Sequence, residues 1–586
     1  MKKIRCEFQR IYYNLDKILL LFFTLFTIME FVWIPLNSWI SEVLLSMTNY
    51  DYLSPTNLWS VLLGNGFVAI LFLLLFLLNV AIAYLELALL FTGVWYLLDE
   101  NTKHLLDYMR NIRNHMVAIV QRSSLPKFIF LLLYSVLLLP FLRRILNIYY
   151  FNKIIIPQFI LEYFSNTTWL AIFIFFCFLL FFWLSSRLMY ALPYIYFEHK
   201  SVRESIVYSW NMTRGREQLR SFFRLFWLVT FPILLFSGIG FLLYGWQRLL
   251  DEYLPNVAHT SALFSYVLLK FSFYGVIALF MMNFVSLLTG KEIPVYRRRN
   301  LRHRLRFAIL LLSSFTFTIQ GWIALTFPFE TMPVTISHRG VDDRNAVQNS
   351  IDALEKISRL KPDYVEMDIQ ETKDGQFVVM HDTDLMLLTG HSGGTHDYTL
   401  AELTSMTVSE NGMTAQVPSF DDYLEKADSL GQKLLVEIKA TSADSPNLSQ
   451  QFVKKYGKRL ILKGHQVQSL DYNIIVDIKN YDERLVSFFI LPFNSIYPRT
   501  AADGYTMEYT SLDKNFMLKS WFRDKLVYAW TPNDEDSMMR MILLQVDGII
   551  TDNMTELQSL IREMQDNRQY AYLFLLQFQS LLYHFE

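Results

Sequence analysis

Residues 363–368 are Asp-Tyr-Val-Glu-Met-Asp, and the chain runs on from them to Val-Val-Met-His-Asp at 378–382. Apolar and polar side chains alternate through the first stretch, which is the pattern of a β-strand. On such a strand the carboxylates of Glu366 and Asp368 point to the same face. Neighbouring carboxylates repel each other unless a cation lies between them or one is protonated, and hard divalent cations prefer oxygen ligands. A solvated edge strand explains the pair equally well, so the rest of the chain decides its interpretation.

Short apolar runs alternate with helical patterns on both sides of this strand. The apolar runs are 333–337, 364–370, 376–380, 433–438, 464–469, 485–491, 526–530 and 546–551. Alternating strands and helices over roughly 250 residues predict a single (β/α)8 barrel of the TIM type. In such barrels the reactive side chains gather at the C-terminal ends of the strands. The candidates at such positions here are His338, Arg339, Glu366, Asp368, Glu437 and Lys439.

The chain before about residue 328 has a different composition from the barrel. Hydrophobic residues make up 53% of the whole sequence, with 49 phenylalanines, which is typical of a membrane protein. Segments long enough to cross a bilayer lie near 18–36, 58–98, 127–148, 168–190, 224–246, 262–289 and 307–327. We therefore predict a multi-pass α-helical membrane domain over 1–328 with about seven helices.

The distribution of Lys and Arg predicts the orientation of this domain. The N-terminal arm is basic and the loop 38–57 has neither residue, so the N-terminus is expected in the cytoplasm. The basic segment 291–306 precedes the last crossing, which places everything after about Phe327 outside the cell. The loop 143–167 gives the weakest signal of this series. Glu86 lies inside a predicted crossing and is a functional candidate, although a helix–helix contact explains it equally well.

Other features narrow the biological setting. The two cysteines, Cys6 and Cys177, lie in the basic arm and in an apolar run, so we expect no disulfide. The N-terminus does not have the pattern of a cleavable signal peptide. The barrel half is acidic, and no nucleic-acid partner is expected. The sequence carries no signal for an oligomeric state. The apolar tail 568–586 is too short to span a bilayer and predicts an interfacial helix.

An ordered set of motifs in the barrel half resembles the glycerophosphodiester phosphodiesterase family. The motifs are His338-Arg339-Gly340, Gln348-Asn349-Ser350, Glu366-Met367-Asp368, Thr372-Lys373-Asp374-Gly375, His381-Asp382, Val417-Pro418-Ser419-Phe420, Glu437-Ile438-Lys439, Gln468-Ser469, Trp530-Thr531-Pro532-Asn533 and Asp547 to Asn553. They cover most of 333–560 in the family's order. The helical half is similar to that of Gram-positive members with an integral membrane region.

The resemblance implies specific roles for these residues. Glu366, Asp368 and Glu437 would hold a divalent cation, with Ca²⁺ or Mg²⁺ favoured over Mn²⁺, while His338 and His381 would act as general acid and base. Arg339 and Lys439 would neutralise phosphate charge, because a phosphodiester gains negative charge as it is attacked. Imidazoles are suited to both proton transfers near neutral pH. Asn349 and Trp530 are expected next to the site. The barrel domain is expected over 329–567, with a small insertion at about 383–417.

One position departs from the family pattern, which has Pro-Glu-Asn where this chain has Val347-Gln348-Asn349. Gln348 removes a charge near the site and could change metal affinity, substrate preference or activity. Two further interpretations concern single residues. We expect Asp552 and Asn553 to cap the following helix rather than touch substrate. We expect His391 and His396 to lie in a surface loop.

The predicted function is hydrolysis of glycerophosphodiester bonds at the outer face of the membrane. Candidate substrates are glycerophosphodiesters, lysophospholipid headgroups and polyglycerol-phosphate polymers such as lipoteichoic acid. One alternative is a non-catalytic membrane receptor or scaffold that binds such phosphodiesters. Another is an enzyme related to phosphatidylinositol-specific phospholipase C or sphingomyelinase D, which share the two-histidine barrel chemistry. Turnover with metal dependence separates the enzyme from the receptor.

Overall fold

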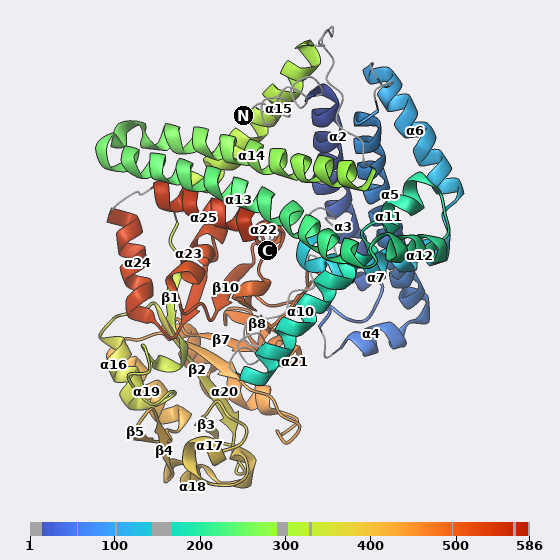
Figure 1. Cartoon of the computed structure of the whole chain (residues 1–586). Helices are drawn as coiled ribbons and strands as arrows, with labels where there is room; N and C mark the ends of the chain where they lie inside the picture. Colours follow the sequence, from blue (N-terminus) through green and yellow to red (C-terminus); the bar gives the residue numbers. More distant parts are fainter. Residues whose placement is uncertain are drawn as a thin grey trace. The chain divides into compact units, whose positions relative to one another are not determined.

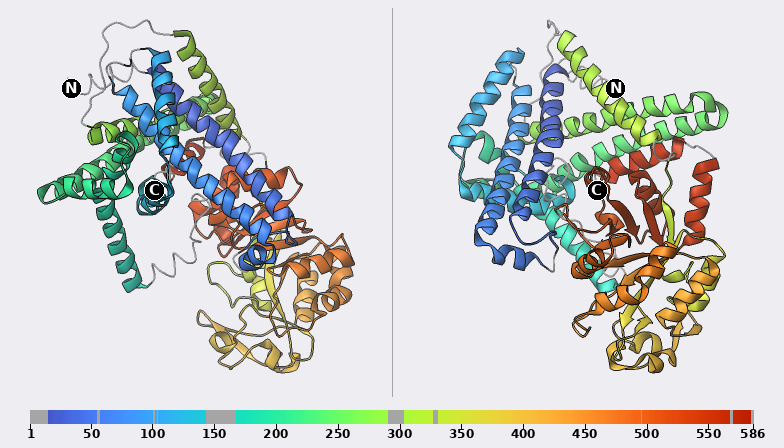
Figure 2. Two further views of the ribbon diagram at one scale, coloured as in Figure 1. Left: turned by 90° about the vertical axis from the view of Figure 1, so that its right-hand side faces the viewer. Right: turned by 180° about the vertical axis from the view of Figure 1, so that it is seen from behind.

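The computed structural model describes residues 15–54, 57–99, 102, 104–142, 167–289, 303–326, 331–494, 496–566 and 570–583 (Figure 1, Figure 2). They form two compact units. The membrane unit comprises Met1–Thr48, Ser60–Leu325 and Gln569–Glu586, and the barrel unit comprises Asn49–Trp59 and Thr326–Arg568. The basic N-terminal arm with Cys6, the loop at 143–166 and the basic cluster at 290–302 lie outside the described residues.

The membrane unit is entirely helical in its described part. Its elements are α2 (Leu15–Ile28), η1 (Met29–Trp33), α3 (Ile34–Ser46), α5 (Gly66–Leu97), α6 (Leu105–Gln121), α7 (Leu125–Leu142), α10 (Thr168–Leu188), α11 (Ala191–Phe197), α12 (Val202–Met212), α13 (Arg216–Tyr253), α14 (Pro255–Thr289), α15 (His303–Thr326) and α25 (Tyr570–Tyr583). The short helix α4 (Leu58–Gly64) begins at the end of the barrel segment 49–59 and continues into this unit.

Five of the described helices are long and apolar enough to cross a membrane, or six if the bent pair α6–α7 counts as one span. The chain is therefore a multi-pass membrane protein, while its number of crossings and its orientation stay predictions. Glu86 lies in α5 and is only 3% exposed. Its two carboxylate oxygens have no hydrogen-bond partner among the described residues.

Helix α25 packs within the membrane unit rather than with the barrel that precedes it in the chain. The Phe578 ring lies so close to Gly240 of α13 that any side chain at Gly240 would collide with it. Phe578 also contacts Phe236 on the same helix, with ring centroids 5.5 Å apart. At the start of α25, the Ala571 N–H donates to Asp251 Oδ2 at 2.6 Å. Close aromatic packing and a charge-assisted hydrogen bond thus fix the helix at both its beginning and its end.

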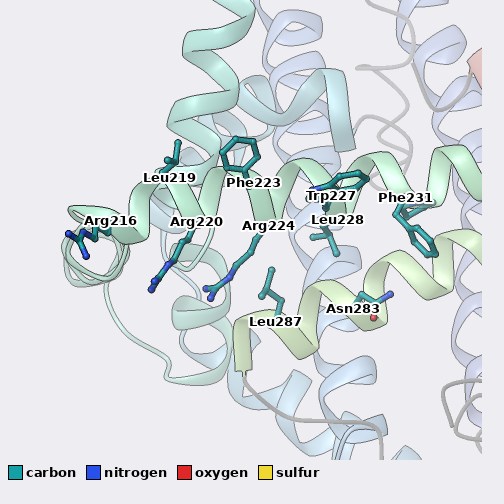
Figure 3. A pocket seen from close by; sticks show the side chains of 11 residues that line it. Arg216, Leu219, Arg220, Phe223, Arg224, Trp227, Leu228, Phe231, Asn283 and Leu287 are labelled. Atoms are coloured by element: carbon teal, nitrogen blue, oxygen red, sulfur yellow. The ribbon is translucent and has the colours of Figure 1, made fainter. Parts of the chain in front are cut away.

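A groove of about 860 Å³ runs along the first half of α13 and is completed by Asn283 and Leu287 of α14. Figure 3 shows Arg216, Arg220 and Arg224 on one face of α13, followed by apolar and aromatic side chains. The residues that line this groove include no carboxylate and no imidazole. The groove therefore lacks the acid, base and charged oxygen ligands that phosphodiester hydrolysis requires, whereas the barrel unit contains all three kinds of group.

Eight parallel strands form the barrel unit's closed sheet. They are β1 (Val334–Ser337), β2 (Tyr364–Glu371), β6 (Leu434–Ile438), β7 (Gln466–Ser469), β8 (Ser487–Leu491), β9 (Gly504–Glu508), β10 (Leu526–Trp530) and β11 (Gly548–Thr551). Their order is β1-β11-β10-β9-β8-β7-β6-β2, and pairing of β1 with β2 closes the ring. The predicted (β/α)8 barrel is thus confirmed.

Helices follow all of these strands except β8, which leads to β9 with no helix among the described residues between them. They are α16 (Ile351–Ser358), α19 (Phe420–Leu430), α20 (Leu448–Lys463), α21 (Tyr472–Tyr481), α22 (Lys514–Trp521), α23 (Glu535–Leu544) and α24 (Met554–Asp566). Many of them begin with an Asp or Ser side chain that accepts a backbone N–H of the first turn, such as Ser419 at α19 and Asp534 at α23. Inside the barrel, Ile336, Leu435, Phe488, Tyr528 and Ile550 form an apolar floor.

A small subdomain follows β2. Strand β3 (Phe377–Val379) pairs antiparallel with β2, and beyond it come α17 (Met386–Thr389), η4 (Thr395–Asp397), α18 (Leu400–Thr404) and the hairpin of β4 (Thr407–Glu410) and β5 (Met413–Gln416). These elements have their own apolar cluster around Leu385, Leu403 and Val417. The subdomain brings His381 and Glu410 to the C-terminal end of the barrel strands, where His381 lies near Asp368 of β2 and Glu410 meets Gln348, in the segment between β1 and α16.

Candidate active site

Strand register places the candidate side chains near the C-terminal ends of the strands, above the apolar floor. Asp368 of β2 is the direct neighbour of Glu437 on β6, and Glu437 is the neighbour of Gln468 on β7. Because side chains alternate between the two faces of a strand, Glu366 lies on the same face as Asp368, one layer closer to the floor. Both residues are almost completely buried, at 2% and 1% exposure. The barrel interior is therefore acidic at its C-terminal end.

The carboxylates of Glu366, Asp368 and Glu437 form a compact cluster. One oxygen from each lies within 4.8 Å of the others, a spacing that could hold a metal ion. Burial, together with the charges of Asp368 and Glu437, raises the pKa of Glu366 well above that of an ordinary glutamic acid. Burial and Asp368 also raise the pKa of Glu437. A cation at this position would remove the mutual repulsion that these shifts express.

Asp368 is the member of the cluster that stays ionised. Burial opposes its charge, but Lys439, Arg339 and His381 together hold the pKa of Asp368 below the usual range. Lys439 Nζ lies 3.1 Å from Asp368 Oδ1 and 2.6 Å from Glu437 Oε1. Asn349 fixes the carboxylate further, because its amide donates to Asp368 Oδ2 at 2.9 Å and its oxygen accepts the Asp368 N–H. The expected proximity of Asn349 and Lys439 to the acidic pair is therefore found.

The two histidines share one arrangement, in which Nδ1 faces a carboxylate. His338 Nδ1 lies 2.7 Å from Asp552 Oδ1, and His381 Nδ1 lies 2.7 Å from Asp382 Oδ1. A carboxylate at Nδ1 fixes the ring orientation and stabilises the imidazolium, which leaves Nε2 for proton transfer. Burial lowers the pKa of His381. The positive charges of Arg339 and Lys439 lower it further, whereas the Asp368 carboxylate raises it. His381 is therefore suited to accept a proton at neutral pH.

Asp552 corrects one expectation. The interpretation of its side chain as a helix cap is wrong, because Oδ1 bonds His338 and Oδ2 accepts from Asn533 Nδ2 at 2.7 Å. The side chain of Asp342 accepts the Thr555 N–H in the first turn of α24. Burial opposes ionisation of Asp552, yet the hydrogen bonds and charge of His338 hold its pKa below normal. Asp552 thus orients a candidate catalytic group.

Arg339 adopts a left-handed backbone conformation with φ 53°, which is uncommon for a residue with a side chain. This conformation directs its N–H to Glu366 Oε2 at 3.0 Å. Its guanidinium Nη1 donates to Gln348 Oε1 at 2.5 Å, and its Nε lies 3.5 Å from Asp368 Oδ2. Strain of this kind gathers at functional sites, where the surrounding structure maintains it.

Gln348, the departure from the family pattern, connects Arg339 to the small subdomain. Its side-chain amide donates to Glu410 Oε1 at 2.9 Å, and its backbone N–H donates to Glu410 Oε2 at 3.0 Å. The family has its acid at the position of Gln348. In this chain the nearby carboxylate is that of Glu410, which is hydrogen-bonded to the Gln348 side chain. The charge lost at Gln348 has a counterpart on the β4–β5 hairpin.

Replacement of Gln348 by glutamate tests this connection. The new carboxylate would face Glu410 at hydrogen-bond distance, so we expect the contact with the hairpin to weaken by about 1–3 kcal/mol. The melting midpoint and the protease resistance of 383–417 should both fall. The double variant Gln348→Glu/Glu410→Gln restores a donor opposite an acceptor and should recover both properties. Equal values for the single variant and the parent would contradict the connection.

Gln468 had no role assigned from the sequence, although it lies against the carboxylate cluster, whereas Trp530 was expected next to the site. Gln468 donates to Glu366 Oε1 at 3.3 Å and to Glu437 Oε2 at 3.4 Å, while its own Oε1 has no partner among the described residues. The buried indole N–H of Trp530 also has no partner there. The unsatisfied acceptor of Gln468 beside the carboxylates is suited to a polar ligand. Gln468 could have been found from the sequence, because the motif Gln468-Ser469 is part of the family resemblance.

A second acidic group lies nearby, on the other side of β2. His396 Nε2 is 2.8 Å from Asp444 Oδ1, and together with Glu371 they are close enough to hold a cation. His396 is thus paired within the fold and contacts Thr441, whereas His391 lies on the exposed surface as expected. Both Glu371 oxygens accept hydrogen bonds from Ser445. Glu371 is therefore held by Ser445, and His396 is paired with Asp444.

A cavity of about 960 Å³ opens beside Lys439, which contacts the cluster. His381, Asp382 and Lys439 line one part, and the remaining walls come from 383–384, 386–387, 440–441, 470–471 and Tyr52. Tyr52 is remote in sequence, in the segment that joins α3 to α4. The cavity thus combines a histidine, a lysine and an acidic cluster behind them, which is a suitable set for hydrolysis of a phosphodiester.

Comparisons with known proteins agree with this geometry. Residues 4–319 match the membrane domain of glycerophosphoryl diester phosphodiesterase, and residues 338–556 match the glycerophosphoryl diester phosphodiesterase family. The chain belongs to the glycerophosphoryl diester phosphodiesterase family. It is a phosphodiesterase of this family with a membrane domain.

Relatives of known name match the barrel half. A glycerophosphodiester phosphodiesterase of Caldanaerobacter subterraneus subsp. tengcongensis is 25% identical over 239 residues, which cover 39% of this chain and 98% of that protein. A glycerophosphodiester phosphodiesterase of Bacillus subtilis is 23% identical over 246 residues, which cover 37% of this chain and 83% of that protein. A solved phosphodiesterase of Oleispira antarctica, in complex with the product sn-glycerol-3-phosphate, has a TM-score of 0.35 and 19% identity over 40% of this chain and 99% of that one.

The residues present fit a divalent cation. All members of the first cluster offer carboxylate oxygens, which hard cations prefer, and the raised pKa values of Glu366 and Glu437 indicate that these two carboxylates lack nearby positive charge. The unsatisfied Gln468 Oε1 adds a further oxygen beside them. This chain could therefore hold a divalent metal at Glu366, Asp368 and Glu437.

Proposed function

We propose that the protein hydrolyses glycerophosphodiesters at the outer face of the membrane in a metal-dependent reaction that uses two histidines. The observation that carries the proposal is the buried carboxylate cluster with His338 and His381 beside it, each histidine held by its own carboxylate. The outward orientation follows from the distribution of Lys and Arg along the membrane half. Lysophospholipid headgroups and polyglycerol-phosphate polymers belong to the same chemical class of substrate.

Each residue has a defined task in this proposal. Glu366, Asp368 and Glu437 would hold a cation, which when bound neutralises negative charge on the phosphate. Arg339 and Lys439 bring further positive charge to the same oxygens. His381, whose pKa is lowered by burial, removes a proton from the water that attacks the phosphorus. His338, whose ring is oriented by Asp552, gives a proton to the leaving alkoxide.

Release of glycerol 3-phosphate measures the proposed activity directly. The full chain in detergent or nanodiscs should release it from a glycerophosphodiester, and a chelator should abolish the release. Addition of Ca²⁺, Mg²⁺ or Mn²⁺ in turn should restore it and would identify the metal. Release that persists in metal-free protein would contradict the role of the carboxylate cluster. Binding without any release, by folded and metal-loaded protein, would contradict catalysis.

A further inference from the structure

The segment 49–59 lies in sequence between helices of the membrane unit, yet it belongs to the barrel unit. The Asp51 carbonyl accepts the Arg499 N–H at 2.8 Å. The Tyr52 ring packs edge-on against Phe489 at 4.8 Å and against Tyr472 at 5.6 Å. Phe489 is part of β8 and Tyr472 begins α21, so Tyr52 is anchored to the barrel wall itself.

The segment also stabilises its own conformation. Asn57, which is nearly buried, donates to the Tyr52 carbonyl at 3.0 Å and accepts the Ser54 N–H at 2.8 Å. An asparagine that bonds two backbone groups in this way holds a turn in one shape. The position of Tyr52 is therefore fixed by its ring contacts with the barrel and by the hydrogen bond from Asn57 to its carbonyl.

Tyr52 stands in the same cavity as the reactive groups. The cavity that contains His381 and Lys439 is lined by Tyr52 and by three apolar side chains, Met386, Leu387 and Leu470. These three are 50%, 84% and 51% exposed. Large apolar side chains that share a concave wall with a catalytic group are suited to an apolar part of the substrate, because water leaves both surfaces on binding.

We propose that Tyr52, Met386, Leu387 and Leu470 form a subsite for an acyl or alkyl chain on the phosphodiester. The inference rests on the proposed function and narrows it to amphiphilic substrates such as lysophospholipids, in which a single chain leads away from the scissile group. Glycerol and small headgroups are polar and gain nothing from this wall. Continuity with His381 distinguishes the subsite from a general membrane contact, since a chain bound there remains attached to the phosphate under attack.

The experiment compares two substrates with the same headgroup, one with an acyl chain and one without. The full chain in nanodiscs is assayed for kcat/KM on a lysophospholipid below its critical micelle concentration and on the matching glycerophosphodiester. The wild-type protein should prefer the lysophospholipid. Leu387→Ser and Tyr52→Ala should each lower that preference by about 10-fold, the usual effect of lost apolar contacts in a pocket. The measured quantity is the ratio of the two kcat/KM values.

Leu462→Ser serves as the matched control, because Leu462 is 82% exposed on α20 and does not line the cavity. It should leave the ratio unchanged. Leu387→Ser keeps the test valid if Tyr52→Ala fails to fold, since Leu387 is almost fully exposed. Ratios equal to wild type in the folded variants would overturn the subsite.

Three further outcomes distinguish a substrate subsite from a surface that contacts the membrane. A loss in Leu387→Ser that appears only with substrate embedded in bilayers, and not with dissolved lysophospholipid, would assign the wall to membrane contact and overturn the subsite. Absence of turnover on both substrates would overturn the proposed function instead. Equal turnover of both substrates by the wild-type protein would leave that function standing and remove the subsite.

Discussion

Glu366→Gln is expected to reduce phosphodiesterase activity by about 1,000-fold, because a metal supplies several kcal/mol of charge stabilisation and this residue is its most buried candidate glutamate ligand. The same substitution should stabilise the metal-free protein. Burial and two neighbouring carboxylates raise the pKa of Glu366, so its ionisation costs folding free energy. The glutamine keeps one oxygen for the Arg339 N–H, and rotation of the Gln468 amide, whose Nε2 now faces Glu366 Oε1, would turn its unsatisfied Oε1 toward the new amide.

The pH dependence gives this prediction a definite sign. Below the ordinary glutamic acid pKa of 4.5, the Glu366 carboxyl is protonated in both the folded and the unfolded chain, so the wild type loses no stability there. As pH rises above that value, the unfolded chain releases the proton before the folded protein does, and the wild type is destabilised. The melting midpoint of metal-free Glu366→Gln should therefore exceed that of the wild type by a margin that grows with pH.

Metal addition completes the comparison. Divalent cation should raise the melting midpoint of the wild type, as any ligand of the native state does, and have little effect on Glu366→Gln. Glu402→Gln, in the exposed first turn of α18, is the control and should behave as wild type in both assays. Equal stabilisation of Glu366→Gln and wild type by the metal would show that the cation binds elsewhere.

His338→Asn is the second substitution with a large expected effect. General acid–base catalysis contributes about 10²- to 10⁴-fold, so kcat should fall by that factor while the metal-induced rise in melting midpoint persists. His391→Asn, which changes an exposed histidine in the small subdomain, should leave kcat unchanged. A loss of metal response in His338→Asn would contradict a separate proton-transfer role.

Asp552→Asn should produce a smaller loss than His338→Asn, because the ring remains but loses the carboxylate that orients it. A substrate with a more acidic leaving alcohol needs less protonation, so it should recover much of the activity of both variants. A purely structural role of Asp552 would lower activity on both substrates alike. The recovery therefore identifies the proton that the His338–Asp552 pair delivers.

The local pattern around Glu366 and Asp368 was sufficient to predict this part of the barrel. Alternation fixed the strand and the common face, and the strand ends placed His338 and Glu437 at the same end of the barrel. Asp552 was misinterpreted because an aspartate before a helix is a typical cap, and only its distance to His338 shows a different partner. An aspartate can either cap a helix or orient a histidine, so the residue type alone does not separate the two roles.

Two other features depend on contacts that no local pattern encodes. Gln348 was recognised as a departure, but its partner Glu410 lies on a hairpin far along the chain, and only the folded subdomain brings the two together. Tyr52 lies in the loop 38–57, whose lack of Lys and Arg indicates an orientation but no contact with the barrel. Its role in the cavity follows from packing against Phe489 and Tyr472, which sequence spacing does not predict.

The packing of α25 in the membrane unit has a consequence for release of the barrel. Because chain on both sides of residues 326–568 belongs to the membrane unit, this part of the barrel unit, which carries the whole closed sheet, is covalently joined to that unit at both of its ends. A protease that cuts only after α15 leaves the barrel attached through α25, and one that cuts only before α25 leaves it attached through α15. Shedding of a soluble catalytic fragment therefore requires two cuts, and a single nick leaves the enzyme bound to its membrane.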